Sequence, residues 1–97
     1  MPAYFMVQLQ ITDAERFKEY ATQVPATIAQ YGGRYLVRGG EYQVLEGEWP
    51  RRRHVVLEFP SAEQARAWYD SDEYAPLKAL RLSASEGAGI LIEGVEP

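Results

Sequence analysis

Gly32-Gly33-Arg34-Tyr35-Leu36-Val37-Arg38-Gly39-Gly40 is a short run of strand-forming residues enclosed by two pairs of glycines. Side chains of a strand alternate between two faces, so Arg34 and Arg38 are predicted on one face and Tyr35 on the other. The residues before this stretch have the pattern of a strand and then a helix. Those after it have the pattern of a strand, a helix and a strand. The stretch therefore predicts the second strand of an α+β fold.

The segment before this strand is predicted to be a strand and an amphipathic helix. Apolar residues alternate over Tyr4–Ile11, which indicates a strand with one apolar face. Thr12-Asp13-Ala14-Glu15 has the pattern of a capping box and predicts that a helix begins here, with the threonine as its cap. Pro25 predicts a kink or short break, and Gly32 the helix end. The apolar stripe of this helix is Ala14, Phe17, Ala21, Val24, Ile28 and Tyr31.

The segment after Gly39-Gly40, where we expect a bulge or bend, completes the fold. A strand is predicted over Arg53–Phe59, and a second capping box, Ser61-Ala62-Glu63-Gln64, begins a helix. Asp70-Ser71-Asp72-Glu73 interrupts that helix, and Ile90–Ile92 forms a short last strand. The order predicts a ferredoxin-like βαββαβ fold, with a four-stranded antiparallel sheet and helices on one face.

The second face of this sheet is predicted to be apolar. It would present Tyr4, Met6, Leu36 and Val56 to water in a monomer. Soluble monomers rarely leave such a patch uncovered. We therefore expect a homodimer that covers this face.

Composition limits the partners. A length of 97 residues predicts one domain over 1–97, and 14 acidic against 10 basic residues predict neither a nucleic-acid nor a membrane partner. The basic run Arg51-Arg52-Arg53 beside Trp49 is expected to be a solvated turn. One histidine and no cysteine predict no metal site, and we expect no cofactor. The absence of cysteine and of a run of ~20 apolar residues favours a cytoplasmic protein.

Three segments carry a family resemblance: Tyr35–Gly40, Val44–Trp49 and Glu58–Ser61. Ser71–Tyr74 and Lys78–Arg81 extend it over nearly the whole chain. The chain resembles the family called domain of unknown function 1330, in the dimeric α+β barrel superfamily. The resemblance implies a ferredoxin-like subunit whose open sheet face packs on that of a second subunit. It implies no reaction, because the superfamily includes cofactor-free monooxygenases, isomerases, dehydrochlorinases and haem-handling proteins.

A cluster of charged residues on the second face is the predicted site: Arg34, Arg38, His54 and Glu58. One interpretation is a structural Arg38–Glu58 pair, because ion pairs also build ordinary structure. The other is an anion pocket in which a guanidinium binds a carboxylate or enolate. The predicted catalytic residues are His54 and Glu58. The predicted ligand-binding residues are Arg34, Arg38, Tyr4, Tyr69, Tyr74 and Arg81.

Two functions follow from these interpretations. The first is a homodimer that binds a small anionic organic molecule and acts on it by cofactor-free proton transfer. The alternative is a non-catalytic dimeric binding or interaction module with a structural charge cluster. Whether the protein is an enzyme is left open. A cavity beside Arg38 would separate the two functions, because a ligand needs space as well as charge.

Overall fold

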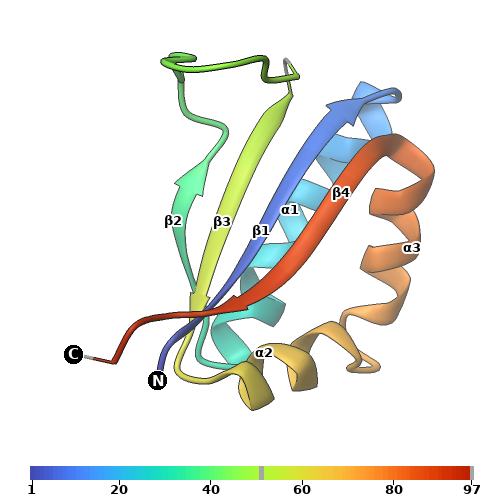
Figure 1. Cartoon of the computed structure of the whole chain (residues 1–97). Coiled ribbons are helices and arrows are strands. Elements are labelled where there is room, and N and C mark those ends of the chain that lie inside the picture. The colour runs from blue at the N-terminus through green and yellow to red at the C-terminus, as the bar shows by residue number, and fades with distance from the viewer. Residues whose placement is uncertain (51, 97) are drawn as a thin grey trace.

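Helices cover only one face of the sheet (Figure 1). The computed structural model describes residues 1–50 and 52–96. The four strands lie in the order β2-β3-β1-β4, and all neighbours are antiparallel. This confirms the predicted ferredoxin-like fold, with the second helix divided in two. In chain order the elements are β1 (Ala3–Ile11), α1 (Ala14–Gln30), β2 (Arg34–Arg38), β3 (Arg53–Phe59), α2 (Ala62–Tyr69), α3 (Ala75–Ala84) and β4 (Ser85–Glu93).

The core lies between the sheet and the helices. Its centre is Trp68 of α2, whose ring contacts those of Phe59 and Tyr74. The indole nitrogen of Trp68 donates to Thr27 Oγ1 at 3.0 Å, so this buried donor is satisfied. Each apolar side chain buried here contributes about 1.5–3 kcal/mol. The other large buried side chains are Val7, Leu9, Phe17, Tyr20, Val24, Ile28, Leu57 and Leu77.

The two ends of α1 are fixed by different residues. Asp13 caps the first turn by accepting from the amide of Arg16 at 3.1 Å, so the prediction that Thr12 is the cap was wrong. The Thr12 amide instead donates to the carbonyl of Ala84 at the end of α3. Gly32, with φ of +80°, closes the helix as predicted, because glycine adopts this conformation without strain. Pro25 lies inside α1, which is one continuous helix of 17 residues.

Strand β4 is longer than predicted. It pairs with β1 from Ser85 opposite Ile11 to Glu93 opposite Ala3, so the two glycines before Ile90 do not delay its start. A Cβ atom at Gly87 would overlap the carbonyl of Gln8. Glycine here permits a close approach of two backbones.

The second helical region begins as predicted. Ser61 Oγ accepts from the amide of Gln64 at 3.1 Å and caps α2. Between α2 and α3, Ser71 Oγ accepts from the amide of Tyr74 at 3.1 Å and donates to the carbonyl of Trp68. These bonds place the fully buried Tyr74 against the core at the start of α3.

Candidate functional site

The pairing of β2 with β3 divides the predicted cluster between the two faces of the sheet. Arg34 lies opposite Glu58, but the register shifts between Tyr35 and Val37, and Arg38 lies opposite Val55. One extra residue in a strand turns every side chain after it to the opposite face of the sheet. Arg38 therefore lies on the helix side. The predicted Arg38–Glu58 pair was wrong: Arg34 Nε is 2.7 Å from Glu58 Oε1.

Three rows of side chains on the open face contain the predicted site residues and the apolar side chains between them. The first row contains the Arg34–Glu58 pair with Tyr4 and Ile92. The middle row is entirely apolar: Val37, Val56, Met6 and Ile90. The third row contains His54, Gln8 and Ala88. Because residues four apart on a strand are about 13 Å apart, His54 and Glu58 share this face without meeting.

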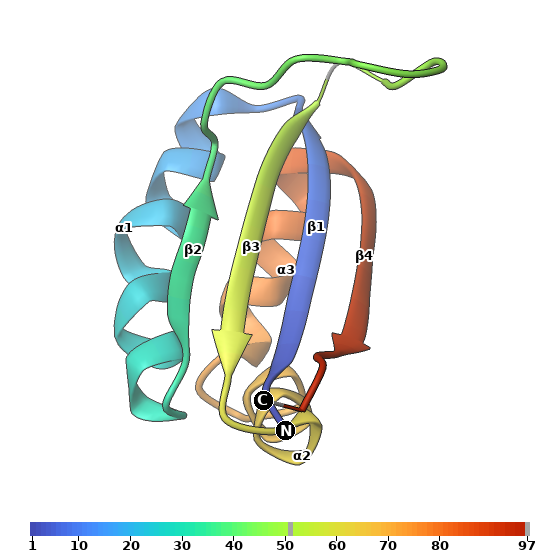
Figure 2. The same ribbon diagram turned by 60° about the vertical axis from the view of Figure 1, so that its left-hand side comes forward.

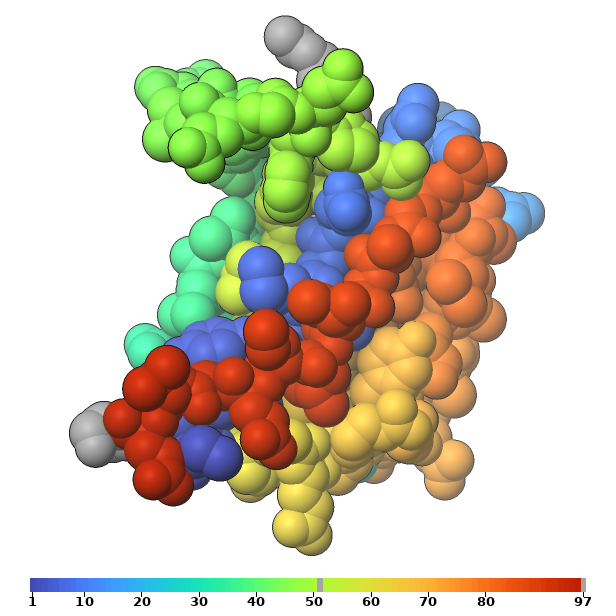
Figure 3. All heavy atoms as spheres, viewed as in Figure 1, coloured from blue at the N-terminus to red at the C-terminus, as the bar shows by residue number. Residues whose placement is uncertain are grey.

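An arm, residues 40–50, projects from the open side of the sheet between β2 and β3 (Figures 1 and 2). Trp49 Nε1 donates to His54 Nε2 at 2.8 Å, and the Tyr42 ring lies edge-on to His54 at 4.7 Å. Trp49 and His54 border a hollow of about 170 Å³ on the open face. Figure 3 shows the arm along the upper rim of this face.

The basic run at the end of the arm does not form one continuous patch in the described residues. Arg51 lies outside the described residues. Arg52 donates to the carbonyl of Glu86 on β4, and Arg53 lies opposite the buried Leu9, on the helix side of β3.

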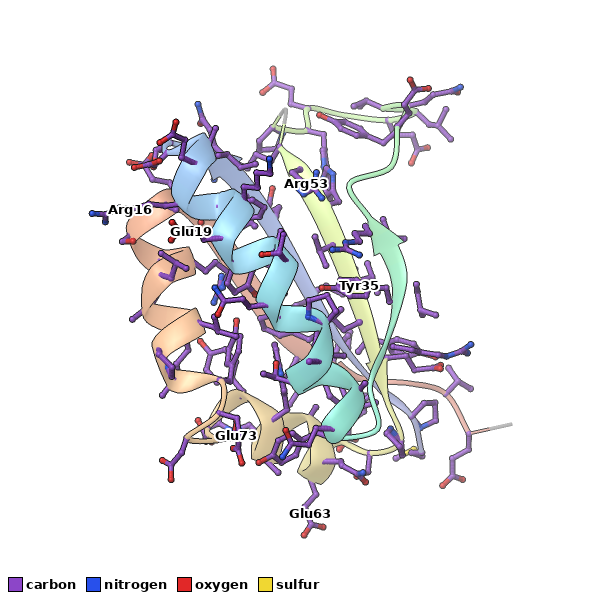
Figure 4. All side chains as sticks on the ribbon, turned by 180° about the vertical axis from the view of Figure 1, so that it is seen from behind. Arg16, Glu19, Tyr35, Arg53, Glu63 and Glu73 are labelled. Carbon is purple, nitrogen blue, oxygen red and sulfur yellow. The ribbon has the colours of Figure 1, made fainter. Side chains whose placement is uncertain are left out.

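The helix-side cavity lies between the sheet and α1. Its volume is about 30 Å³, enough for roughly two water molecules. Its walls are mostly aromatic and aliphatic. Its polar lining residues are Tyr20, Tyr35, Arg38, Arg53 and Arg81. Figure 4 shows Arg53 and Tyr35 on the side of the sheet that faces α1.

Arg38 is held at this cavity by the proline in α1. Pro25 has no amide hydrogen, so the carbonyl of Ala21, four residues earlier, has no intrahelical donor. Arg38 Nη2 donates to that carbonyl at 3.1 Å, and the guanidinium carbon lies 4.6 Å from the centre of the Tyr35 ring. Arg38 is also exposed, so the cavity reaches the surface beside it.

Arg53 lines the cavity, and its guanidinium lies close to Gly39. A Cβ atom at Gly39 would lie 2.5 Å from Arg53 Nη1, and Gly39 has φ of +69°, so both space and backbone favour glycine. The guanidinium carbon lies 5.7 Å from the centre of the Phe17 ring. Arg53 Nε is buried and has no hydrogen-bond partner in the described residues.

Arg81 is the most deeply buried of the charged lining residues, with 6% of its surface exposed. Its Nε donates to the Tyr74 hydroxyl at 3.2 Å, and the Tyr74 and Tyr20 hydroxyl oxygens are 3.0 Å apart. Burial lowers the pKa of Arg81, but Tyr74 and Tyr20 outweigh that effect and the pKa is raised overall. Burial also raises the pKa of Tyr20 and of Tyr35. The Arg81 guanidinium is thus charged, and the Tyr20 and Tyr35 hydroxyls are neutral, at physiological pH.

The structure separates the predicted site residues into two groups. Arg38 and Arg81 meet at the helix-side cavity, and Tyr74 lies behind it, bonded to Arg81. Arg34, Tyr4, His54 and Glu58 belong to the open face. Tyr69 does not line the cavity; Lys78 Nζ lies 4.2 Å from the centre of its ring.

Sequence reasoning missed Tyr20, Tyr35 and Arg53 as residues of this cavity. The signal for Tyr20 was available, because Phe17, Tyr20 and Val24 also have the three and four spacing of a helix face. Tyr35 was correctly placed on the face opposite Arg34 but was not connected to a site. Arg53 had no distinguishing pattern, since it ends a run of three arginines.

Two other kinds of feature are absent from residues 1–50 and 52–96. No group of three or more histidine, cysteine, aspartate or glutamate side chains there is arranged to hold a metal ion. None of the described helices has the length and apolar character needed to cross a bilayer.

The fold and the cavity define a ferredoxin-like α+β protein with one open sheet face. The chain belongs to the family described as domain of unknown function (DUF1330), which matches residues 2–95. No curated protein matches it.

Solved structures share the fold at low sequence identity. A protein of unknown function from Rhodopseudomonas palustris is similar with a TM-score of 0.79 and 17% identity, over 99% of this chain and 84% of that one. A dimeric ferredoxin-like protein of unknown function from Jannaschia sp. has a TM-score of 0.72 and 12% identity, over 97% and 100%. SnoaB, a cofactor-independent oxygenase from Streptomyces nogalater, has a TM-score of 0.66 and 12% identity, over 99% and 95%. Identities this low show the fold alone.

Proposed function

We propose that this protein binds a small anionic organic molecule in the helix-side cavity. One observation carries the proposal: Arg38, Arg53 and Arg81 line the same cavity, and no ion pair among the described residues includes any of them. A buried guanidinium without a carboxylate, such as that of Arg81, has an uncompensated charge. A carboxylate or enolate supplies both the acceptors and the opposite charge.

The shape of the cavity supports a small anionic group at its inner part. A volume of about 30 Å³ admits the two oxygen atoms of a carboxylate, which take the place of about two water molecules. The rest of the ligand would extend toward the surface beside Arg38. The aromatic and aliphatic walls favour an organic ligand over an inorganic ion.

The protein acts as a homodimer in this proposal. The apolar middle row of the open face includes Met6, with 42% of its surface exposed, and Ile90, with 54%. A second copy would cover this row. The description of the Jannaschia protein as dimeric supports the same arrangement. Light scattering at micromolar concentration tests it, and a particle of only 11.0 kDa would contradict it.

Binding is better supported than proton transfer. His54 and Glu58 lie on the face opposite the cavity, so they do not reach a ligand beside Arg38. Cofactor-free catalysis by these two residues stays a prediction for a ligand on the open face, as does the non-catalytic interaction module. The oxygenase SnoaB has the same fold, which is compatible with either function. The cytoplasmic location also stays a prediction.

A thermal-shift screen with sodium salts of small carboxylates at constant ionic strength tests the binding function. We expect a stabilising shift in the native protein and its loss in Arg38→Met, because the guanidinium would contact the anion. Arg34→Met is the matched control, since Arg34 lies on the open face and pairs with Glu58. Absence of any shift in the native protein, or equal loss in both variants, contradicts the proposal.

A further inference from the structure

Arg81, Tyr74 and Tyr20 form a hydrogen-bonded series at one wall of the helix-side cavity. Arg81 Nε donates to the Tyr74 hydroxyl at 3.2 Å, and that hydroxyl is 3.0 Å from the hydroxyl of Tyr20. Tyr20 and Arg81 line the cavity, whereas Tyr74 does not and has no exposed surface. Two members of the series are therefore lining residues of the cavity, and the third lies behind them.

One of the two hydroxyl protons in this series has no hydrogen-bond acceptor within the series. Two phenols have two hydroxyl protons, and a single hydrogen bond joins their oxygens. Neither hydroxyl has another acceptor within hydrogen-bond distance among the described residues. One phenolic proton is consequently available to a ligand or to water.

The burial of the two phenols decides which proton is available. If Tyr20 donated to Tyr74, the Tyr74 proton would have no acceptor in a fully buried place, which costs about 1–3 kcal/mol. If Tyr74 donates to Tyr20, the unused proton is that of Tyr20, which is a lining residue of the cavity. The bond from Arg81 polarises Tyr74 in the same direction and makes it a stronger donor.

We infer that this wall selects a ligand head group that has acceptors and no donors, namely a carboxylate or an enolate. Tyr20 is the specificity-determining donor, Arg81 supplies the positive charge, and Tyr74 is a positioning residue that fixes the direction of the Tyr20 hydroxyl. The inference rests on the proposed function, because it concerns the ligand of the same cavity. It goes further by predicting a preference over amides and amines. An amide has one acceptor oxygen and an amine has none, so an N–H group would face one of the donors of Arg81 and Tyr20.

Two properties of the site strengthen this inference. Burial raises the pKa of Tyr20, so its hydroxyl keeps its proton and remains a donor across the physiological pH range. The small volume of the cavity suits a planar group with two oxygens better than a tetrahedral phosphate.

The two tryptophans of the chain provide a direct measurement. Trp68 lines the cavity, and Trp49 lies on the other side of the sheet. The Trp49→Phe protein therefore has a single indole, whose fluorescence reports on the cavity. Sodium acetate, its neutral isostere acetamide and sodium phosphate are titrated into this protein at one ionic strength. We expect acetate to bind at least tenfold more tightly than acetamide or phosphate.

Variants in the same background test the individual roles. Tyr20→Phe should weaken acetate binding by roughly 10-fold or more, because a hydrogen bond to a charged group is lost. Tyr74→Phe should lower the ratio of acetate to acetamide affinity, since the Tyr20 hydroxyl can then turn and accept from an amide. A purely structural role of Tyr74 would change both affinities alike. Tyr31→Phe is the control, because that hydroxyl bonds Glu73 away from the cavity.

The outcomes separate this inference from the proposed function. If no small carboxylate changes the fluorescence or the thermal stability, the proposed function fails and the inference fails with it. If acetate binds but Tyr20→Phe keeps the full preference over acetamide, the inference alone is overturned. Tighter binding of phosphate than of acetate also overturns it. If Tyr74→Phe does not fold, the ratio measured with Tyr20→Phe decides the question.

Discussion

The two sides of the sheet both carry arginines, but only one side supplies them with a carboxylate. On the open face Arg34 pairs with Glu58 at 2.7 Å. On the helix side Arg38, Arg53 and Arg81 border a cavity without an acidic partner among the described residues. The Arg34–Glu58 pair accounts for the charge of Arg34 within the chain, whereas a ligand anion is our proposal for the arginines at the cavity.

The apolar side chains show the opposite contrast. On the helix side they are covered by α1, α2 and α3, and the core there is filled by residues such as Trp68 and Ile28. On the open face no helix of the described chain covers the row through Met6 and Val56, and Figure 3 shows this face open below the arm. One face is thus completed by the chain itself, and the other is expected to be completed by a second copy.

The largest effect is expected from Met6→Asp, which would place a carboxylate in the apolar middle row of the open face. A carboxylate without a partner in an apolar interface costs several kcal/mol, so the dimer should dissociate. Light scattering measures the change in mass. Leu82→Asp, on an exposed position of α3, is the control and should leave the mass unchanged. A dimer that survives Met6→Asp would mean that another surface holds it together.

Ile28→Ala tests the covered side. Ile28 is 2% exposed, and truncation of such a residue lowers the free energy of unfolding by about 2–5 kcal/mol. Denaturant unfolding measures it. Lys18→Ala, at an exposed position of α1, should change the same quantity by less than about 0.5 kcal/mol. A loss below that value for Ile28→Ala would show that α1 does not pack as described.

Pro25→Ala tests whether the proline in α1 positions the Arg38 guanidinium. An alanine amide would donate to the Ala21 carbonyl, and the helix should gain stability by up to about 3 kcal/mol. Arg38 would then share or lose that acceptor, so carboxylate affinity should fall even though the fold is more stable. Unfolding and anion titration on one sample measure both changes. Unchanged affinity would separate the position of Arg38 from the proline.

The smallest effect is expected from Arg34→Met. The pair with Glu58 is largely solvated on the arginine side, with 70% of that side chain exposed, and such pairs contribute about 0–1 kcal/mol. Denaturant unfolding of the variant should show a change within this range. A loss well above it would mean that the dimer buries the pair.

The order of the elements was predictable from alternation and capping residues, but the facing of Arg38 was not. A bulge adds one residue, and here it falls within Arg34–Arg38 instead of at Gly39-Gly40, where we expected it. Leu36 and Val37 are ordinary strand residues, so their identity does not show which is extra. The same limit applies to β4, which we expected only over Ile90–Ile92, whereas Gly87 lies inside it and permits a close contact with β1.

The cavity was beyond sequence reasoning for a different reason. Its residues come from β1, β2, β3 and all three helices. The hydrogen bonds that join Tyr20, Tyr74 and Arg81 span up to 54 positions in the chain. Local periodicity gives the face of each residue but not which faces meet. Pro25 was a local sign beside the spacing of Tyr20, because a proline within a helix leaves a carbonyl for a donor from elsewhere.

The bond between the arm and His54 has a consequence for the tautomer of that histidine. An indole N–H can only donate, so Nε2 of His54 must present its lone pair to Trp49. The neutral ring then carries its proton on Nδ1, which is buried and has no partner in the described residues. Neither nitrogen has a free lone pair while the arm is in place. His54 can therefore accept a proton from a ligand only after Trp49 has moved away, which makes the position of the arm a condition for any base catalysis on the open face.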